Sequence, residues 1–146
     1  MPRRLLVAVY LILALSPWVL ADGSSPAAAC KSYFVALNDR DYATCWKLCS
    51  GHTRDAYVRE SAGIMQVPPA DARHLFDSGD SQITPFWDNM RKHARADIFV
   101  QLQYKTQSIN GNAAVVTAIG PKGSMPLQAF KEGGSWKFGV MESSGQ

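Results

Sequence analysis

The sequence contains none of the short motifs that usually mark a catalytic or metal site. It has no glycine-rich phosphate-binding loop and no nucleophile elbow. Its three histidines, His52, His74 and His93, are too far apart in the chain to form a short metal-binding motif. We therefore expect no metal ion and no other cofactor.

A large excess of charge of one sign is also missing. The chain has 15 Lys and Arg against 12 Asp and Glu, and two of the basic residues, Arg3 and Arg4, lie at the N-terminus. The rest of the chain is close to neutral, which gives no electrostatic basis for binding nucleic acid or anionic lipid. With 47% hydrophobic and 18% charged residues among 146, the composition is that of one globular domain.

The longest hydrophobic run, residues 5–15, follows Arg3 and Arg4 and is ended by Ser16-Pro17. Short residues follow at positions 19–21, so we predict that residues 1–21 are a secretory signal peptide cleaved after Ala21. The mature protein is then periplasmic or secreted. Residues 22–25 would form a linker, 26–141 a single domain and 142–146 a tail. The alternative is an uncleaved membrane anchor, although the run is shorter than the roughly 20 residues of a membrane span.

Residues 26–50 predict two short amphipathic helices joined by a polar turn at residues 38–41. Each helix carries apolar residues at helical spacing, which predicts one buried stripe per helix. These positions are Cys30, Tyr33, Phe34 and Leu37 in the first helix and Tyr42, Cys45, Trp46 and Cys49 in the second. Asp41 is best explained as the N-cap of the second helix.

Cysteine is scarce, and its odd count matters in an exported chain. Three cysteines allow one disulfide and a leftover thiol, or a bond to another chain. Antiparallel helices around the turn would place Cys30 level with Cys49, and we predict a Cys30–Cys49 disulfide. It would add about 3 kcal/mol of stability in the chain-entropy model. A bond between Cys45 and Cys49, one helical turn apart, is the alternative.

The middle of the chain is less regular. Residues 53–61 predict a helix or a short strand, and residues 70–76 one or two helical turns. A clearer helix starts at Thr84, because Pro85 suits the first helical position and an apolar stripe follows. The basic residues at its end complement the helix dipole.

Alternating residues predict four strands, at 97–106, 113–119, 125–131 and 135–141. Asn110-Gly111 is a strong hairpin signal between the first two strands. We expect an α+β fold in which N-terminal helices pack on a curved antiparallel sheet of at least four strands. The face that carries Ile98, Val100, Leu102 and Tyr104 should receive the helices.

This order of elements resembles the nuclear transport factor 2-like superfamily, and in particular its exported bacterial members. The residues that carry the resemblance are Tyr33-Phe34-Val35-Ala36-Leu37, Asp41-Tyr42, Trp46-Lys47-Leu48-Cys49-Ser50 and Phe130-Lys131-Glu132-Gly133-Gly134-Ser135-Trp136-Lys137-Phe138. The resemblance implies a cone-like curved sheet with a pocket at its open end. The superfamily includes isomerases, dehydratases, small-molecule binders and protein-interaction modules, so the fold alone does not choose a function.

Aromatic residues are the candidates for lining such a pocket, although ordinary core packing explains them as well. They are Tyr33, Trp46, Trp87, Tyr104 and Trp136. The leading hypothesis is a non-catalytic exported domain that binds a protein partner or a small apolar ligand, as an accessory or immunity-type protein would.

The first alternative is a small pocket enzyme of isomerase or hydrolase type, for which the candidate catalytic residues are Tyr104, His74 and Asp97. The second is a membrane-anchored assembly component, if residues 1–21 are retained. A homodimer through the sheet is possible in each case.

Overall fold

The computed structural model describes residues 23–145, so the predicted signal peptide and cleavage site lie outside the described residues. The fold is α+β, as predicted. The helices are α1 (Pro26–Asn38), α2 (Tyr42–Leu48), α3 (Gly51–Met65), α4 (Pro69–Ser78), the 3₁₀ helix η2 (Ser81–Ile83), α5 (Thr84–His93), α6 (Ala96–Phe99) and α7 (Val140–Ser143). The strands are β1 (Gln103–Asn110), β2 (Ala113–Gly120), β3 (Gly123–Glu132) and β4 (Ser135–Gly139).

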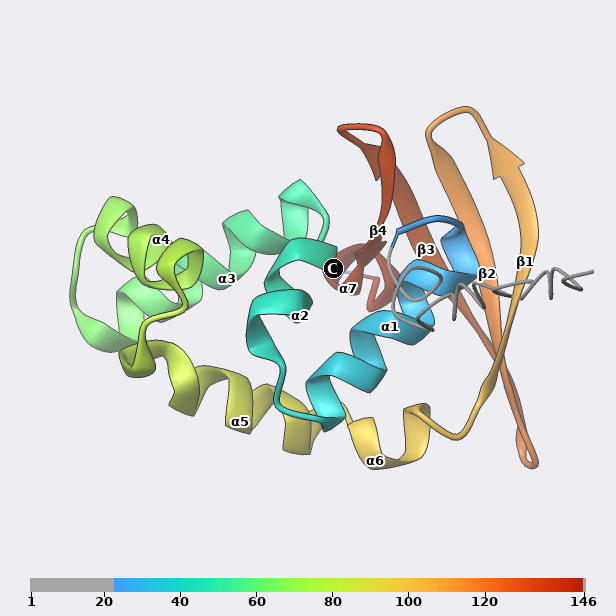
Figure 1. The fold of residues 1–146 in the computed structure, drawn as a ribbon, viewed down its shortest axis with the longest axis horizontal. Coiled ribbons are helices and arrows are strands. Elements are labelled where there is room, and N and C mark those ends of the chain that lie inside the picture. The colour runs from blue at the N-terminus through green and yellow to red at the C-terminus, as the bar shows by residue number, and fades with distance from the viewer. Residues whose placement is uncertain (1–22, 146) are drawn as a thin grey trace, which may run out of the picture.

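The strands form one antiparallel sheet in the order β1-β2-β3-β4, which confirms the predicted meander. Tight turns join neighbouring strands, and Gly111 in the first turn has a positive φ of 60°, which glycine adopts without strain. Helix α1 lies across one face of the sheet and packs against all four strands (Figure 1). The buried residues on that face include Val116, Leu127, Ala129 and Phe138.

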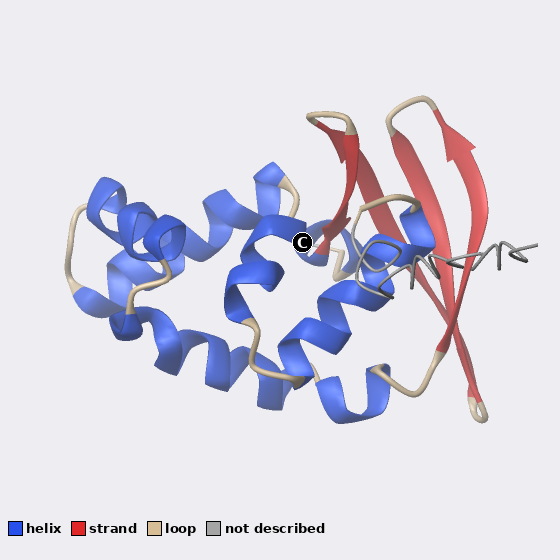
Figure 2. Cartoon of the chain, in the orientation of Figure 1, coloured by secondary structure: helices blue, strands red, loops and turns tan. Residues whose placement is uncertain are grey.

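Helices α3, α4 and α5 extend away from the sheet and form a helical arm (Figures 1 and 2). The core therefore has two aromatic clusters. The sheet cluster packs Phe34 of α1 against Phe99 and Phe138, with ring centroids 4.4 Å and 5.3 Å apart. The arm cluster contains Trp46, Tyr57, Phe76, Phe86 and Trp87.

The two clusters meet through a buried pair of hydroxyl groups. Tyr33 of α1 and Tyr57 of α3 share a hydrogen bond of 3.2 Å between their hydroxyl oxygens. Both side chains are buried, and burial raises the pKa of each well above its ordinary value of 10.0. The phenols are therefore neutral, and their hydrogen bond satisfies polar atoms that burial would otherwise leave unpaired.

The start of the predicted first strand is wrong. Residues 96–99 form helix α6, and β1 begins only at Gln103. Ile98, which we expected to receive the helices, is 44% exposed. The alternating pattern misled because the same residues also fit a helix: Ala96 is buried, and Phe99 and Val100, three and four positions later, face the core.

Residues 51–65 and 69–78 are helical, which settles the open choice between helix and strand for residues 53–61. They form the hairpin of α3 and α4 that builds most of the arm. At the other end of the chain, the predicted strand 135–141 stops at Gly139, and α7 follows it directly. Helix α7 packs back against α3 and β3.

The predicted Cys30–Cys49 disulfide is absent, because Cys30, Cys45 and Cys49 are all free and buried in the described chain. Cys49 does not belong to a helix face as we assumed. It follows the end of α2 with an extended backbone and forms a parallel bridge with Phe138 of β4. The thiol of Cys45 donates to the carbonyl oxygen of Tyr33 at 3.7 Å.

The two edges of the sheet differ. Along β4, the backbone N–H of Trp136 donates to the carbonyl oxygen of Gly23 at 2.8 Å, and Cys49 adds its bridge to Phe138. Strand β1 has no neighbour on its outer side among residues 23–145. A homodimer through the sheet, which stays a prediction, would use this edge.

Candidate ligand cleft

A cleft of about 260 Å³ lies between the turn that joins α1 to α2 and the segment that joins α4 to α5. It lies where the start of α2 meets the helical arm, rather than inside the curved sheet. Its lining residues are Arg40, Asp41, Tyr42, Ala43, Phe76, Gly79, Asp80, Ile83, Thr84 and Trp87.

The floor of the cleft is aromatic and fixed in place. Trp87 is only 2% exposed, stacks on the ring of Tyr42 with centroids 5.7 Å apart, and meets Phe76 edge-to-face at 5.8 Å. The hydroxyl of Tyr42 donates to the carboxylate of Asp88 on α5. Burial and this carboxylate raise the pKa of Tyr42 to about 12, so the phenol stays neutral and keeps its bond.

One wall of the cleft is the turn after α1. Arg40 has a positive φ of 60°, and the N–H of Asp41 donates to the carbonyl of Ala36 at 2.8 Å, as in a Schellman helix ending. The carboxylate of Asp41 accepts from the backbone N–H of Thr44 at 3.3 Å and from its hydroxyl at 2.7 Å. This confirms the prediction that Asp41 caps the second helix.

The opposite wall is the segment between α4 and α5. Gly79 ends α4 with a positive φ of 65°, which a glycine tolerates. Asp80 then caps η2, because its Oδ1 accepts from the N–H of Gln82 at 2.8 Å. Both walls are thus short turns held by capping carboxylates, and each presents a charged residue to the cleft.

Replacing Arg40 with glycine is expected to raise the free energy of unfolding by about 1 kcal/mol. The left-handed conformation costs an L-residue roughly 1–2 kcal/mol, and the greater freedom of glycine in the unfolded chain returns part of that gain. Urea denaturation of Arg40→Gly measures the change. Gln66→Gly is the matched control, since Gln66 has a φ of 56° at the end of α3 and lies outside the cleft lining. A loss of stability in Arg40→Gly would contradict the strain.

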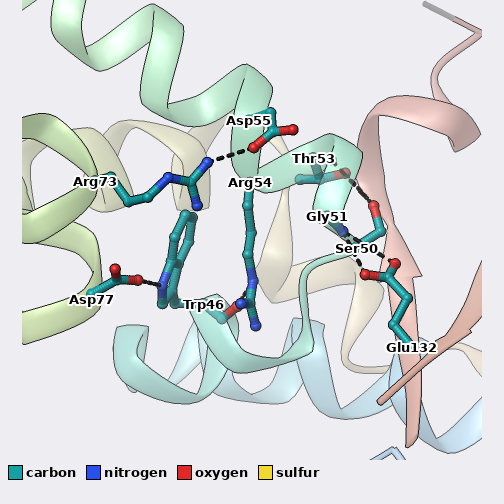
Figure 3. A network of polar contacts seen from close by, with 9 residues as sticks. All are labelled: Trp46, Ser50, Gly51, Thr53, Arg54, Asp55, Arg73, Asp77 and Glu132. Carbon is teal, nitrogen blue, oxygen red and sulfur yellow. Dashed lines mark hydrogen bonds and ion pairs between the residues drawn. The ribbon is translucent and has the colours of Figure 1, made fainter. Parts of the chain in front are cut away.

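Beyond the other end of α2, a polar network fixes the start of α3 (Figure 3). Glu132 of β3 accepts the N–H of Gly51 with its two oxygens at 3.0 and 3.1 Å, and Glu142 of α7 accepts the hydroxyl of Ser50 at 2.9 Å. Carboxylates suit a helix N-terminus because they complement the dipole and the unpaired N–H groups. These charges therefore serve the fold, by joining the arm to the sheet.

Of the five aromatic residues predicted to line a pocket, Trp87 lines the cleft and the other four do not. Tyr33, Trp46 and Trp136 are buried in the core. Tyr104 is half-buried, and its hydroxyl donates to the carbonyl of Phe99 at 2.7 Å. Burial raises the pKa of Tyr104, so its proton is held rather than made available.

The candidate catalytic residues do not converge. His74 is exposed on α4, at the far end of the arm from β1, which carries Tyr104 (Figure 1). Asp97 is exposed on α6 and pairs with Arg95 at 3.4 Å, which lowers the pKa of the carboxyl. Among residues 23–145, no three His, Cys, Asp or Glu side chains are placed to hold a metal ion.

Sequence reasoning missed most of the cleft, including Arg40, Phe76 and Asp80. Each wall is a turn, and turn residues carry no periodic signal. An arginine at the position after a helix where glycine is usual was the one local clue, and it points to the strain described above.

The chain matches no family model, no curated protein and no solved structure. The likeness to the nuclear transport factor 2-like superfamily therefore stays a prediction. In the part of the chain that the structure describes, no helix is long and apolar enough to cross a membrane.

Proposed function

We propose that this protein is an exported, non-catalytic binding domain that takes a small ligand in the cleft between the α1–α2 turn and the α4–α5 segment. The observation that supports this proposal is a hollow with a rigid aromatic floor and charged groups on both walls. Binding sites commonly combine an apolar surface with a few fixed polar groups in this way.

The curved sheet offers less support for a ligand. The face that receives α1 is packed by the protein's own rings, with Phe34 stacked on Phe99 and tilted against Phe138. The neutral hydroxyls of Tyr33 and Tyr57 bond to each other in the core. The aromatic residues beneath the sheet thus act as core, and we place the ligand in the cleft.

A fragment titration followed by amide and indole NMR shifts tests the proposal. Fragments at millimolar concentration are expected to shift signals of Tyr42, Thr84 and the Trp87 indole, all in the cleft. Ala43→Leu should abolish these shifts, because Ala43 is an exposed lining residue and the larger side chain fills the space without entering the core.

The matched control is Ala70→Leu, which enlarges an exposed alanine near the start of α4, outside the cleft lining. It should leave the fragment shifts unchanged. Fragment shifts that persist in Ala43→Leu, or that map to the sheet instead, would contradict the proposed site. Shifts produced only by a purified protein partner would move the proposal from a small ligand to a protein surface.

A further inference from the structure

We infer that the ligand of the cleft is a small zwitterion of the amino-acid class, with an ammonium group, a carboxylate and a compact apolar body. This inference rests on the proposed function and names the chemistry of the same site. It follows from the charges on the two walls, the floor between them and the size of the hollow.

The first step is that the cleft carries both signs of charge on facing walls. Arg40 belongs to the α1–α2 turn, and Asp80 belongs to the segment between α4 and α5. A ligand that spans the cleft meets the cation of Arg40 on one side, next to the carboxylate of Asp41 that caps α2, and the carboxylate of Asp80 on the other. A carboxylate suits the guanidinium, because Arg offers paired donors in a planar fork, and an ammonium group suits the aspartate.

The second step is that both groups keep bonding capacity to spare. Within residues 23–145, the Arg40 guanidinium makes no hydrogen bond and no ion pair, whereas Arg73 pairs with Asp55 at 2.5 Å. Asp80 uses Oδ1 to accept from the N–H of Gln82 and cap η2, and its Oδ2 has no hydrogen-bond partner among the same residues. An incoming ligand can therefore bind both groups without breaking a bond that holds the fold.

The third step excludes ligands of a single charge. A ligand with only anionic groups would bring them close to Asp80 and Asp41, and a ligand with only cationic groups would meet Arg40. In each case one charged wall would be left without a partner while the ligand displaces its water, which disfavours binding. A zwitterion pairs with both walls at once.

The fourth step concerns size and the apolar body. Ile83, Phe76 and Trp87 form an apolar floor between the charged walls. At about 260 Å³, the hollow is smaller than the roughly 300–1,000 Å³ of pockets that hold drug-sized ligands. A free amino acid with an aliphatic or aromatic side chain fits this space, and a nucleotide does not.

A matrix of probes and variants tests the inference by calorimetry at low salt. The probes are L-leucine, L-leucinamide, which lacks the carboxylate, and 4-methylpentanoate, which lacks the ammonium group. Leucine is expected to bind the native protein about tenfold or more tightly than either analogue, since each analogue loses one charged pair.

Each variant should cancel one preference and keep the other. Arg40→Gln is expected to bind leucine and leucinamide equally while still preferring leucine to 4-methylpentanoate. Asp80→Asn is expected to bind leucine and 4-methylpentanoate equally while still preferring leucine to leucinamide. This variant keeps the cap on η2, because asparagine is also a good N-cap. The control Arg59→Gln removes an exposed charge of α3 outside the cleft lining and should change neither preference.

Equal binding of all probes by the native protein, or variants that weaken every probe alike, would overturn the inference. If other fragments occupy the cleft but leucine does not, the inference fails while the proposed function stands. If no fragment occupies the cleft, both fail.

Discussion

Raising the pH of the reduced protein from about 8 to about 10.5 is expected to lower its free energy of unfolding steeply. The main cause below pH 10 is the three buried free thiols of Cys30, Cys45 and Cys49, and tyrosines with a raised pKa add to the loss near pH 10 and above. Burial raises the pKa of Cys30 from 9.0 to about 12 and also raises the pKa of Cys45 and Cys49.

The direction follows from the protons that each state holds. Below pH 9.0 the folded and unfolded chains both keep their thiol protons, so the difference in pKa has no effect. At higher pH the unfolded chain releases them, while folded Cys30 keeps its proton until about pH 12. Each thiol then removes about 1.4 kcal/mol of stability per pH unit. The loss of stability from the three thiols together is large against a total free energy of unfolding of about 5–15 kcal/mol.

Urea denaturation at a series of pH values, with reductant present, measures the slope of stability against pH. Cys30→Ala should remove about one third of the part of that slope that the thiols cause, even though the cavity it leaves lowers stability at every pH. Stability that stays flat over the same range would contradict buried free thiols.

The sheet could be predicted because its signals are local. Asn110-Gly111 specifies a tight turn, and alternating residues on either side of each turn bury one face. The structure places β2 at Ala113–Gly120 and β3 at Gly123–Glu132, close to the predicted 113–119 and 125–131. Local signals failed at residues 96–102, where the apolar residues satisfy the helical and the strand period together.

The cleft could not be predicted, because its parts meet only through the tertiary fold. Arg40 and Asp80 lie in separate turns, brought together when α4 and α5 pack against α2 and its neighbours. The pairing of cysteines failed for a similar reason. It assumed two helices meeting along their whole length, whereas the chain at Cys49 leaves α2 to pair with β4.

Trp46 was a candidate for both the core and a ligand pocket, and the two roles predict different effects on stability and on ligand binding when it is replaced. Its ring stacks on Phe76 with centroids 4.5 Å apart, and the guanidinium of Arg54 lies 5.1 Å from the ring centroid. Its indole N–H donates to Asp77 at 2.9 Å, as Figure 3 shows. Trp46 is 5% exposed and joins α2 to both α3 and α4.

Trp46→Ala is therefore expected to lower the free energy of unfolding by about 3–5 kcal/mol, since it removes a buried ring between two packed groups. Trp46→Phe keeps much of the ring but loses the hydrogen bond to Asp77, at a cost of about 1–3 kcal/mol. Urea denaturation of both variants measures these losses. If Trp46→Ala leaves too little folded protein, Trp46→Phe still gives a value.

A double-mutant cycle of Trp46→Phe with Asp77→Ala separates the hydrogen bond from the packing. In the core role, the second change costs little once the indole N–H is gone, so the two losses are not additive. Fragment binding in the cleft should be unchanged in Trp46→Phe, because Trp46 lies behind Phe76 in the core and does not line the cleft. Full stability combined with lost fragment binding would instead assign Trp46 to the ligand site, as the sequence pattern first allowed.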